Sequence, residues 1–228
     1  MLRFLPARVR GTIALLLYSL NTITFFIIMF PVILLKAIIP LNSVRHRLTQ
    51  LLMFLGLGWI NVNSLILKIT QKIKWDVTGL DGLDPKASYL VISNHRSWAD
   101  ILVLQHLFKH RIPFLKFFLK KELIWVPFLG IAWWALEFPF MKRYSREFIQ
   151  KHPELKGKDI ETTRKYCEKF KKSPISVINF LEGTRFNEPK RQKQQSPYKH
   201  LLLPKAGGAA MVLSVMADCL DQIIDVTI

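Results

Sequence analysis

The stretch SNHRSWAD (residues 93–100) places a histidine and an aspartate five positions apart, directly after the apolar run YLVI. A neutral imidazole can take a proton from a hydroxyl, and a carboxylate on its other nitrogen fixes the tautomer and stabilises the resulting cation. His95 and Asp100 can act together in this way if His95 lies in a loop and Asp100 lies in the first turn of the next helix. A helix cap beside an incidental surface histidine explains the same residues, so both interpretations stay open here.

A second polar cluster, FLEGTR (residues 180–185), also follows an apolar run. Gly183 permits a sharp turn or the close approach of a ligand, and Arg185 can hold a phosphate through two parallel hydrogen bonds. Glu182 and Thr184 lie on either side of the glycine. A polar turn with a Glu–Arg surface pair is the alternative.

Two further basic stretches are weaker signals. FPFMKRYSRE (residues 138–147) contains Arg143, and a solvated basic face accounts for it equally well. LLLPKAGG (residues 201–208) contains Pro204, Lys205 and paired glycines, which are also typical of a turn between a strand and a helix.

Several kinds of chemistry have no motif in this sequence. There is no GxSxG, GxGxxG, Walker loop or HExxH. Cys167 and Cys219 have neither CxxC nor metal-ligand spacing, so we expect no metal site and a reducing compartment. The sequence therefore favours direct, base-assisted attack by a substrate hydroxyl over a covalent intermediate.

The order of apolar patterns predicts the elements that position these residues. Strands are expected at 74–80, 88–93, 175–181 and 223–228, and helices at 100–109, 146–172 and 206–220, with a basic loop at 186–200. This order is typical of an α/β fold with a mixed, mostly parallel sheet flanked by helices. The chain ends on its last strand, so we expect a sheet that lacks C-terminal elements. Ligands of such sheets bind beyond the carboxyl ends of the strands, where both polar clusters would lie.

The first 75 residues contain no Asp or Glu, whereas the whole chain carries a net charge of +17. Such a segment suits an anionic membrane surface. Nucleic-acid binding would instead place basic residues on one helix face or among exposed aromatics. Here the basic residues flank apolar stretches, so we expect anionic membrane lipids, and no nucleic acid, as partners.

Two apolar segments, residues 11–40 and 48–68, lie in this region. A membrane-spanning helix needs about 20 apolar residues, and the first segment is too long for a signal peptide. Glycines and asparagines interrupt the second, which predicts a helix that packs on the first. We predict a membrane-associated helical hairpin over residues 1–73, with both ends on the cytoplasmic side, and a second domain over residues 74–228.

Together the four stretches resemble the motif blocks of the lysophospholipid (glycerol-3-phosphate and 1-acylglycerol-3-phosphate) acyltransferase family. Asn94, His95 and Asp100 match its NHxxxxD motif, and FPFMKR, with Arg143, is similar to its second block. The EGTR block is matched at residues 182–185, and LLLPKAGG is similar to the fourth block. The second block commonly opens with glycine, whereas Glu137 stands here, which leaves the acceptor lipid open between lysophosphatidic acid and larger lysophospholipids.

The resemblance implies roles for these residues. His95 would be the general base, oriented by Asp100, and a second group would bind the acceptor: Asn94, Arg143, Glu182, Gly183, Thr184, Arg185 and Lys205. The acyl donor would be acyl-CoA or acyl carrier protein, with no resident cofactor. The location implied is a membrane, in particular a bacterial inner membrane with the catalytic domain facing the cytoplasm. The alternatives are an acceptor of the lysophosphatidylglycerol or lysocardiolipin type, a non-enzymatic basic membrane adaptor, and a hydrolase that uses the same His–Asp pair.

Overall fold

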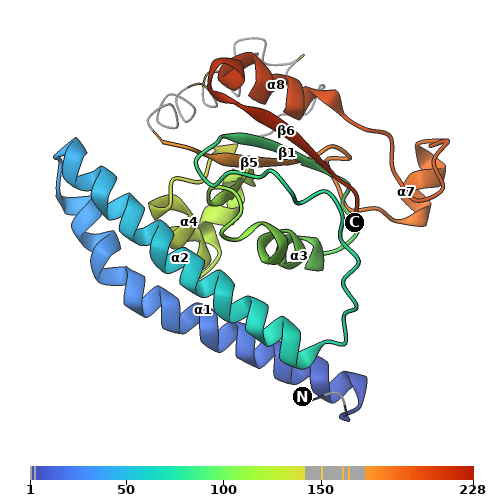
Figure 1. Ribbon diagram of the computed structural model, residues 1–228, viewed down its shortest axis with the longest axis horizontal. Coiled ribbons are helices and arrows are strands. Elements are labelled where there is room, and N and C mark those ends of the chain that lie inside the picture. The colour runs from blue at the N-terminus through green and yellow to red at the C-terminus, as the bar shows by residue number, and fades with distance from the viewer. Residues whose placement is uncertain (1, 3, 142–149, 151–160, 162–163, 165–172) are drawn as a thin grey trace. The chain divides into compact units, whose positions relative to one another are not determined.

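Figure 1 shows the computed structural model of the chain, which describes residues 2, 4–141, 150, 161, 164 and 173–228. The chain forms two compact units. The helical unit comprises Met1–Leu83, Gln105–Lys109 and Glu122–Glu137, and the sheet unit comprises Asp84–Leu104, His110–Lys121 and Phe138–Ile228. Each unit is described by itself.

The helical unit is built on two long helices, α1 (Ala7–Ile38) and α2 (Asn42–Thr70). They run antiparallel, because the Leu2 N–H donates to the carbonyl of Ile69 near the open end of the hairpin. At mid-length the Asn21 amide nitrogen donates to Asn63 Oδ1 (2.8 Å) and to the Trp59 carbonyl (3.1 Å), so two side-chain hydrogen bonds join the helices there. Both helices are long and apolar enough, by length and composition, to cross a membrane. The predicted hairpin is confirmed, and its placement in a membrane stays a prediction.

A short helix, α4 (Leu129–Ala135), packs on α1 in the same unit; it follows the 3₁₀ helix η1 (Lys121–Trp125). The ring of Phe128 meets that of Phe26 edge to face, with centroids 5.1 Å apart. Near the other end of α4, the ammonium of Lys36 donates to the Ala135 carbonyl (2.6 Å) and to the Glu137 carboxylate (3.0 Å). The only charge in the apolar segment 11–40 is therefore buried and held by the end of α4.

The sheet unit contains a four-stranded sheet in the order β2–β5–β1–β6, and every pairing in it is parallel. The bounds of its strands are β1 Tyr89–Ser93, β2 Leu115–Phe117, β5 Ser176–Phe180 and β6 Gln222–Val226. The predicted α/β class with a mostly parallel sheet is confirmed. β1 and β5 are in register along their full length, from Tyr89 opposite Ser176 to Ser93 opposite Phe180.

The core of the sheet unit lies between the sheet and α8 (Ala206–Met216). Val212 and Met216 of α8 pack against Leu90 of β1 and against Ile175 and Val177 at β5. Helix α8 approaches the sheet closely at Gly208, where a Cβ atom would stand 2.6 Å from the side-chain nitrogen of Asn179. Residues 175, 177 and 179 therefore face α8, and because side chains alternate along a strand, Phe180 faces the other way.

Two sequence predictions differ from the structure. Residues 74–80 form no strand, because none of the described strands pairs with them and both Trp75 and Val77 are 40% exposed. The expected basic loop contains a helix, α7 (Glu188–Lys193), whose start is capped by Asn187 accepting from the Lys190 N–H. The structure also has a two-stranded parallel sheet that no sequence pattern predicted, in which β3 (Leu119–Lys120) pairs with β4 (Phe140–Met141).

The other predicted elements are present with shifted ends. α3 spans Ala99–Phe108, and the last predicted helix is α8 followed by the 3₁₀ helix η3 (Ala217–Cys219). The helical stretch predicted at 146–172 lies outside the described residues except for positions 150, 161 and 164.

Candidate active site

Both polar clusters begin at the same edge of the sheet. Ser93 and Phe180 are paired at the ends of β1 and β5, and the Leu181 N–H donates to the Ser93 carbonyl (3.2 Å). The chain leaves this edge as the NHRSWAD loop on one strand and the EGTR loop on its neighbour. The parallel register thus brings together residues about 90 positions apart in the sequence.

The histidine and the aspartate form a direct pair. His95 lies in the loop, Asp100 lies in the first turn of α3, and His95 Nδ1 is 2.8 Å from Asp100 Oδ2. The imidazole stacks on the ring of Phe180, with centroids 4.0 Å apart and an interplanar angle of 16°. Because Nδ1 carries the contact with the carboxylate, Nε2 is the ring nitrogen that can act on a hydroxyl.

Asp100 is fixed by more than the histidine. Its Oδ2 accepts from the backbone N–H groups of Arg96 (2.6 Å) and Ser97 (2.9 Å), and its Oδ1 accepts from the Ser97 hydroxyl (3.2 Å). Burial raises the pKa of the Asp100 carboxyl, but the hydrogen bonds from Ser97, His95 and Arg96 outweigh it and leave the pKa below its usual value. Asp100 therefore binds the loop before the helix, rather than capping the start of α3 as its position predicted.

Glu182 joins three segments of the site. Its carboxylate is buried, with Oε1 accepting from the His95 N–H (2.8 Å) and Oε2 accepting from the Leu202 N–H (2.9 Å). The family resemblance implied that this glutamate binds substrate. In the structure both of its oxygens bind backbone groups, which ties the histidine loop and the segment before α8 to the end of β5.

Like Glu182, Asn94 binds the backbone of a segment far away in the sequence. Its amide nitrogen donates to the carbonyl of Ile228 (3.1 Å), and its amide oxygen accepts from the Ile228 N–H (2.8 Å). These two bonds join the end of β1 to the residues that follow β6. The geometry gives Asn94 a positioning contact next to His95.

Gly183 and Lys205 lie against each other. Gly183 has a φ of +66°, a conformation that favours glycine, and a Cβ atom there would meet Lys205 Cδ at 3.3 Å. The backbone of Lys205 is held by a hydrogen bond to the Leu181 carbonyl (2.7 Å). The lysine side chain is thus brought over the EGTR turn from a segment more than 20 residues away.

Arg185 lies against Trp98, a residue that the NHxxxxD motif does not specify. Its guanidinium carbon lies 4.4 Å from the ring centroid of Trp98, the geometry of a cation–π contact. Both side chains are exposed, so Arg185 is presented to solvent on an aromatic support. Trp98 therefore has a contact of its own at the site, although it occupies an unspecified position of the NHxxxxD motif.

Lys190 is another residue that motif matching missed. Its ammonium donates to the Thr184 hydroxyl and to the Arg185 carbonyl, both at 2.9 Å. Because Lys190 donates to Thr184 Oγ1, the threonine hydroxyl hydrogen can point to a ligand. The Asn-Glu-Pro-Lys helix start at 187–190 is the sequence signal that places Lys190 beside the motif.

The last predicted site residue, Arg143, lies outside the described residues. Within the described ranges, no group of three or more His, Cys, Asp or Glu side chains is arranged to hold a metal ion. The described site therefore combines a histidine oriented by a carboxylate with the basic side chains of Arg185, Lys190 and Lys205.

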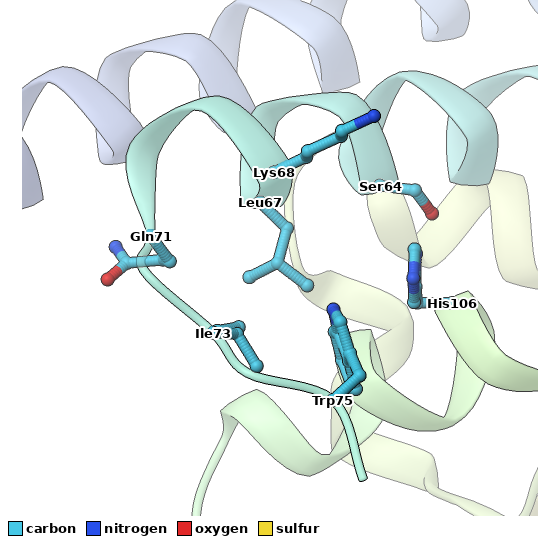
Figure 2. A pocket seen from close by; sticks show the side chains of 7 residues that line it. All are labelled: Ser64, Leu67, Lys68, Gln71, Ile73, Trp75 and His106. Atoms are coloured by element: carbon cyan, nitrogen blue, oxygen red, sulfur yellow. The ribbon is translucent and has the colours of Figure 1, made fainter. Parts of the chain in front are cut away.

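The helical unit has a pocket of its own, with a volume of about 320 Å³. Figure 2 shows its lining: Ser64, Leu67, Lys68, Gln71, Ile73, Trp75 and His106. The rings of Trp75 and His106 stack with centroids 4.8 Å apart, and burial, followed by the charge of Lys109, lowers the pKa of His106. None of the predicted site residues lines this pocket.

The parallel sheet and the two loops at its edge lie in a part of the chain that matches a known protein family. The family model described as Acyltransferase matches residues 74–228, which is more than half of the chain. The chain belongs to this family.

Individual relatives within the family are also similar to this chain. The chain is 31% identical over 163 residues to 1-acyl-sn-glycerol-3-phosphate acyltransferase delta of Rattus norvegicus, covering 64% of this chain and 40% of that protein. It is 26% identical over 232 residues to probable 1-acyl-sn-glycerol-3-phosphate acyltransferase 5 of Arabidopsis thaliana, covering 96% of this chain and 58% of that protein. The chain thus spans about half the length of these relatives.

A solved structure has the same fold. It is the 1-acyl-sn-glycerophosphate (LPA) acyltransferase PlsC from Thermotoga maritima, with a TM-score of 0.53 and 16% identity. The similarity covers 92% of this chain and 72% of that one, so it includes the helical hairpin as well as the sheet.

Proposed function

We propose that this protein transfers a fatty acyl group from an acyl thioester to the free hydroxyl of 1-acyl-sn-glycerol-3-phosphate, giving phosphatidic acid. One observation carries the proposal. The loop with the His95–Asp100 pair and the EGTR turn with its cations follow the ends of neighbouring parallel strands, at one edge of the sheet. A hydroxyl substrate with a phosphate group has one part for each cluster. The relatives named above support the choice of acceptor.

The chemistry follows from the His95–Asp100 geometry. His95 Nε2 takes the proton of the acceptor hydroxyl while its oxygen forms a bond to the thioester carbonyl carbon. The carbon–sulfur bond then breaks, and the proton passes from His95 to the departing thiolate. Asp100 stabilises the imidazolium between these steps, since its carboxylate is held ready by Arg96 and Ser97.

The basic side chains bind the acceptor in this proposal. Arg185 is exposed and oriented by Trp98, Lys205 lies over Gly183, and Thr184 is oriented by Lys190. Cations and hydroxyl donors at a tight turn are the groups that recognise a phosphate. The buried carboxylate of Glu182 and the amide of Asn94 position the loops that carry them.

The donor and the location belong to the same proposal. The donor is acyl-CoA or acyl carrier protein, and the protein works at a membrane, with a bacterial inner membrane and a cytoplasm-facing site as the expected setting. Two helices of membrane-spanning length and the basic, carboxylate-free N-terminal segment support the membrane placement.

The test is acyl transfer by purified full-length protein and its His95→Ala variant. Labelled acyl-CoA is supplied with a panel of acceptors: lysophosphatidic acid, lysophosphatidylglycerol and monolysocardiolipin. We expect phosphatidic acid as the main product and a loss of roughly 10²- to 10⁴-fold in the variant, with His200→Ala, an exposed histidine, as the unchanged control.

Each alternative has its own outcome in this assay. Free fatty acid without any acylated lipid indicates a hydrolase, and transfer to another lysophospholipid alone corrects the acceptor. An inactive wild-type protein that still binds vesicles favours a membrane adaptor. Full activity of His95→Ala would contradict the mechanism.

A further inference from the structure

Four large apolar side chains stand three positions apart in the segment η1–α4 and are exposed. Trp125 is 85% exposed, Phe128 42%, Ile131 45% and Trp134 42%. Side chains three positions apart are neighbours on a helix surface, as Ile131 and Trp134 are on α4, and a group of exposed apolar side chains marks an interaction surface. Tryptophan, with an apolar body and a polar N–H, is typical of the boundary between lipid and water. These four residues are here called the α4 stripe. Their exposure raises the question of what covers them.

Helix α4 packs along one defined part of α1. Phe128, at the start of α4, contacts Phe26 of α1. Ala135 and Glu137, at and just beyond its end, bind Lys36 of α1. Helix α4 therefore runs alongside α1 between residues 26 and 36, a length of about 15 Å at 1.5 Å per residue.

That part of α1 presents apolar side chains to its surroundings as well. Ile27, Ile28, Phe30, Leu34 and Leu35 are exposed, and the whole helix has the length and composition of a membrane span. A medium that covers this half of α1 also reaches the helix packed beside it. The α4 stripe thus continues an apolar surface that α1 already presents.

The contact at Lys36 explains why the two helices stay together in such a medium. A lysine in an apolar segment has to be paired or has to reach water. Lys36 is buried and paired, because its ammonium is held by the end of α4 through a carbonyl and a carboxylate. Separating α4 from α1 would expose this ammonium to the apolar medium.

We propose that the α4 stripe inserts into the bilayer beside α1, as a third membrane-contacting element in addition to the helical hairpin. The occupant is lipid: acyl chains against Phe128 and Ile131, and the headgroup boundary at the tryptophans. The inference rests on the membrane placement in the proposed function.

The experiment measures lipid contact at single positions of the full-length chain in vesicles of phosphatidylcholine and phosphatidylglycerol. Cys167 and Cys219 are replaced by serine, and one cysteine is introduced for a fluorescent label. Three exposed apolar positions of the helical unit are compared: Ile131→Cys (45% exposed), Ile28→Cys on α1 (48%) and Val77→Cys (40%). Val77 is the matched control, because its neighbours Lys74 and Asp76 are too polar for the hydrocarbon region.

We expect nitroxide groups on the lipid tails to quench the label at 131 and at 28, and to leave the label at 77 bright. Quenching at 28 without quenching at 131 overturns the α4 proposal and leaves the hairpin in the membrane. Quenching at neither position overturns both the inference and the membrane placement. Equal quenching at 131 and 77 also overturns the inference, because the contact would not be specific to the stripe.

Acyl transfer is measured on the same labelled proteins. An inactive protein with the expected quenching pattern counts against the proposed reaction and not against the α4 contact, so the two failures are distinguishable.

Discussion

Buried charge is used in opposite ways around Lys36 in the helical unit and around the candidate active site in the sheet unit. In the helical unit the cation is buried and its acidic partner is partly exposed, with side-chain exposures of 3% for Lys36 and 28% for Glu137. In the sheet unit the carboxylates of Asp100 and Glu182 are buried and the cations Arg185 and Lys205 are exposed. This difference separates the charges that hold segments of the chain together from those that are accessible to a ligand.

The buried carboxylates of the sheet unit bind backbone N–H groups. Glu182 takes those of His95 and Leu202, and Asp100 takes those of Arg96 and Ser97. Because the acidic side chains are used to fix loops, they do not neutralise the cations of the same motif. The positive charge of Arg185 and Lys205 thus remains exposed near the EGTR turn, whereas that of Lys36 is paired with Glu137 inside the helical unit.

The largest effect that this comparison predicts is at Glu182. Glu182→Ala leaves the N–H groups of His95 and Leu202 without their acceptors, and each unsatisfied buried group costs about 1–3 kcal/mol. We expect the free energy of unfolding to fall by roughly 2–6 kcal/mol, measured by denaturant titration in detergent micelles, with acyl transfer falling as well because His95 loses its position.

Glu188→Ala is the matched control, since this glutamate is exposed and its ion pair is with its helix neighbour Arg191. We expect a change within about 0.5 kcal/mol there. A Glu182→Ala protein as stable as the wild type, with only the KM for the acceptor raised, would instead make Glu182 a direct substrate ligand.

A smaller effect is expected in the helical unit. Glu137→Ala removes the charged acceptor of Lys36, and a hydrogen bond to a charged group is worth about 1.5–3 kcal/mol. The double change Lys36→Met and Glu137→Ala should recover most of this loss, because the buried charge is then gone. Thermal unfolding followed by tryptophan fluorescence compares these variants with Glu122→Ala, an exposed glutamate of η1.

If the double variant is less stable than Glu137→Ala alone, Lys36 contributes through contacts other than its charge, and the contrast between the two units weakens. Recovery in the double variant with unchanged acyl transfer would confirm that this charge serves packing alone.

The smallest expected effect is at Trp98. Trp98→Ala removes the aromatic support of Arg185, and an exposed cation–π contact is worth about 0.5–1 kcal/mol. The KM for the phosphate-bearing acceptor should rise roughly 2- to 5-fold with kcat unchanged, since 1.4 kcal/mol corresponds to a factor of ten. Trp98→Phe keeps an aromatic ring, so its KM should lie between those of the wild type and Trp98→Ala. An equal rise in KM in both variants would point to a role of the indole other than stacking.

Motif spacing was a good guide where the chemistry is local. The His95–Asp100 spacing fits a loop followed by the first turn of a helix, and the structure places the residues there. Gly183 was expected at a sharp turn or a close approach, and it has both a positive φ and a lysine side chain against it. The alternating pattern at 74–80 misled, because a strand also needs a neighbour to pair with and this segment has none in the described sheets.

By itself, then, the sequence determined the apolar helical hairpin, the order β1, α3, β5, α8 and β6, and the residue types that can do the chemistry. These depend on periodicity and on contacts within a few residues. Only the tertiary structure decided that Glu182 binds backbone from two distant segments, that Trp98 supports Arg185, and that the end of α4 neutralises Lys36. Each of these pairs joins residues more than 10 positions apart, and a pattern read along the chain does not specify which distant partner a side chain meets.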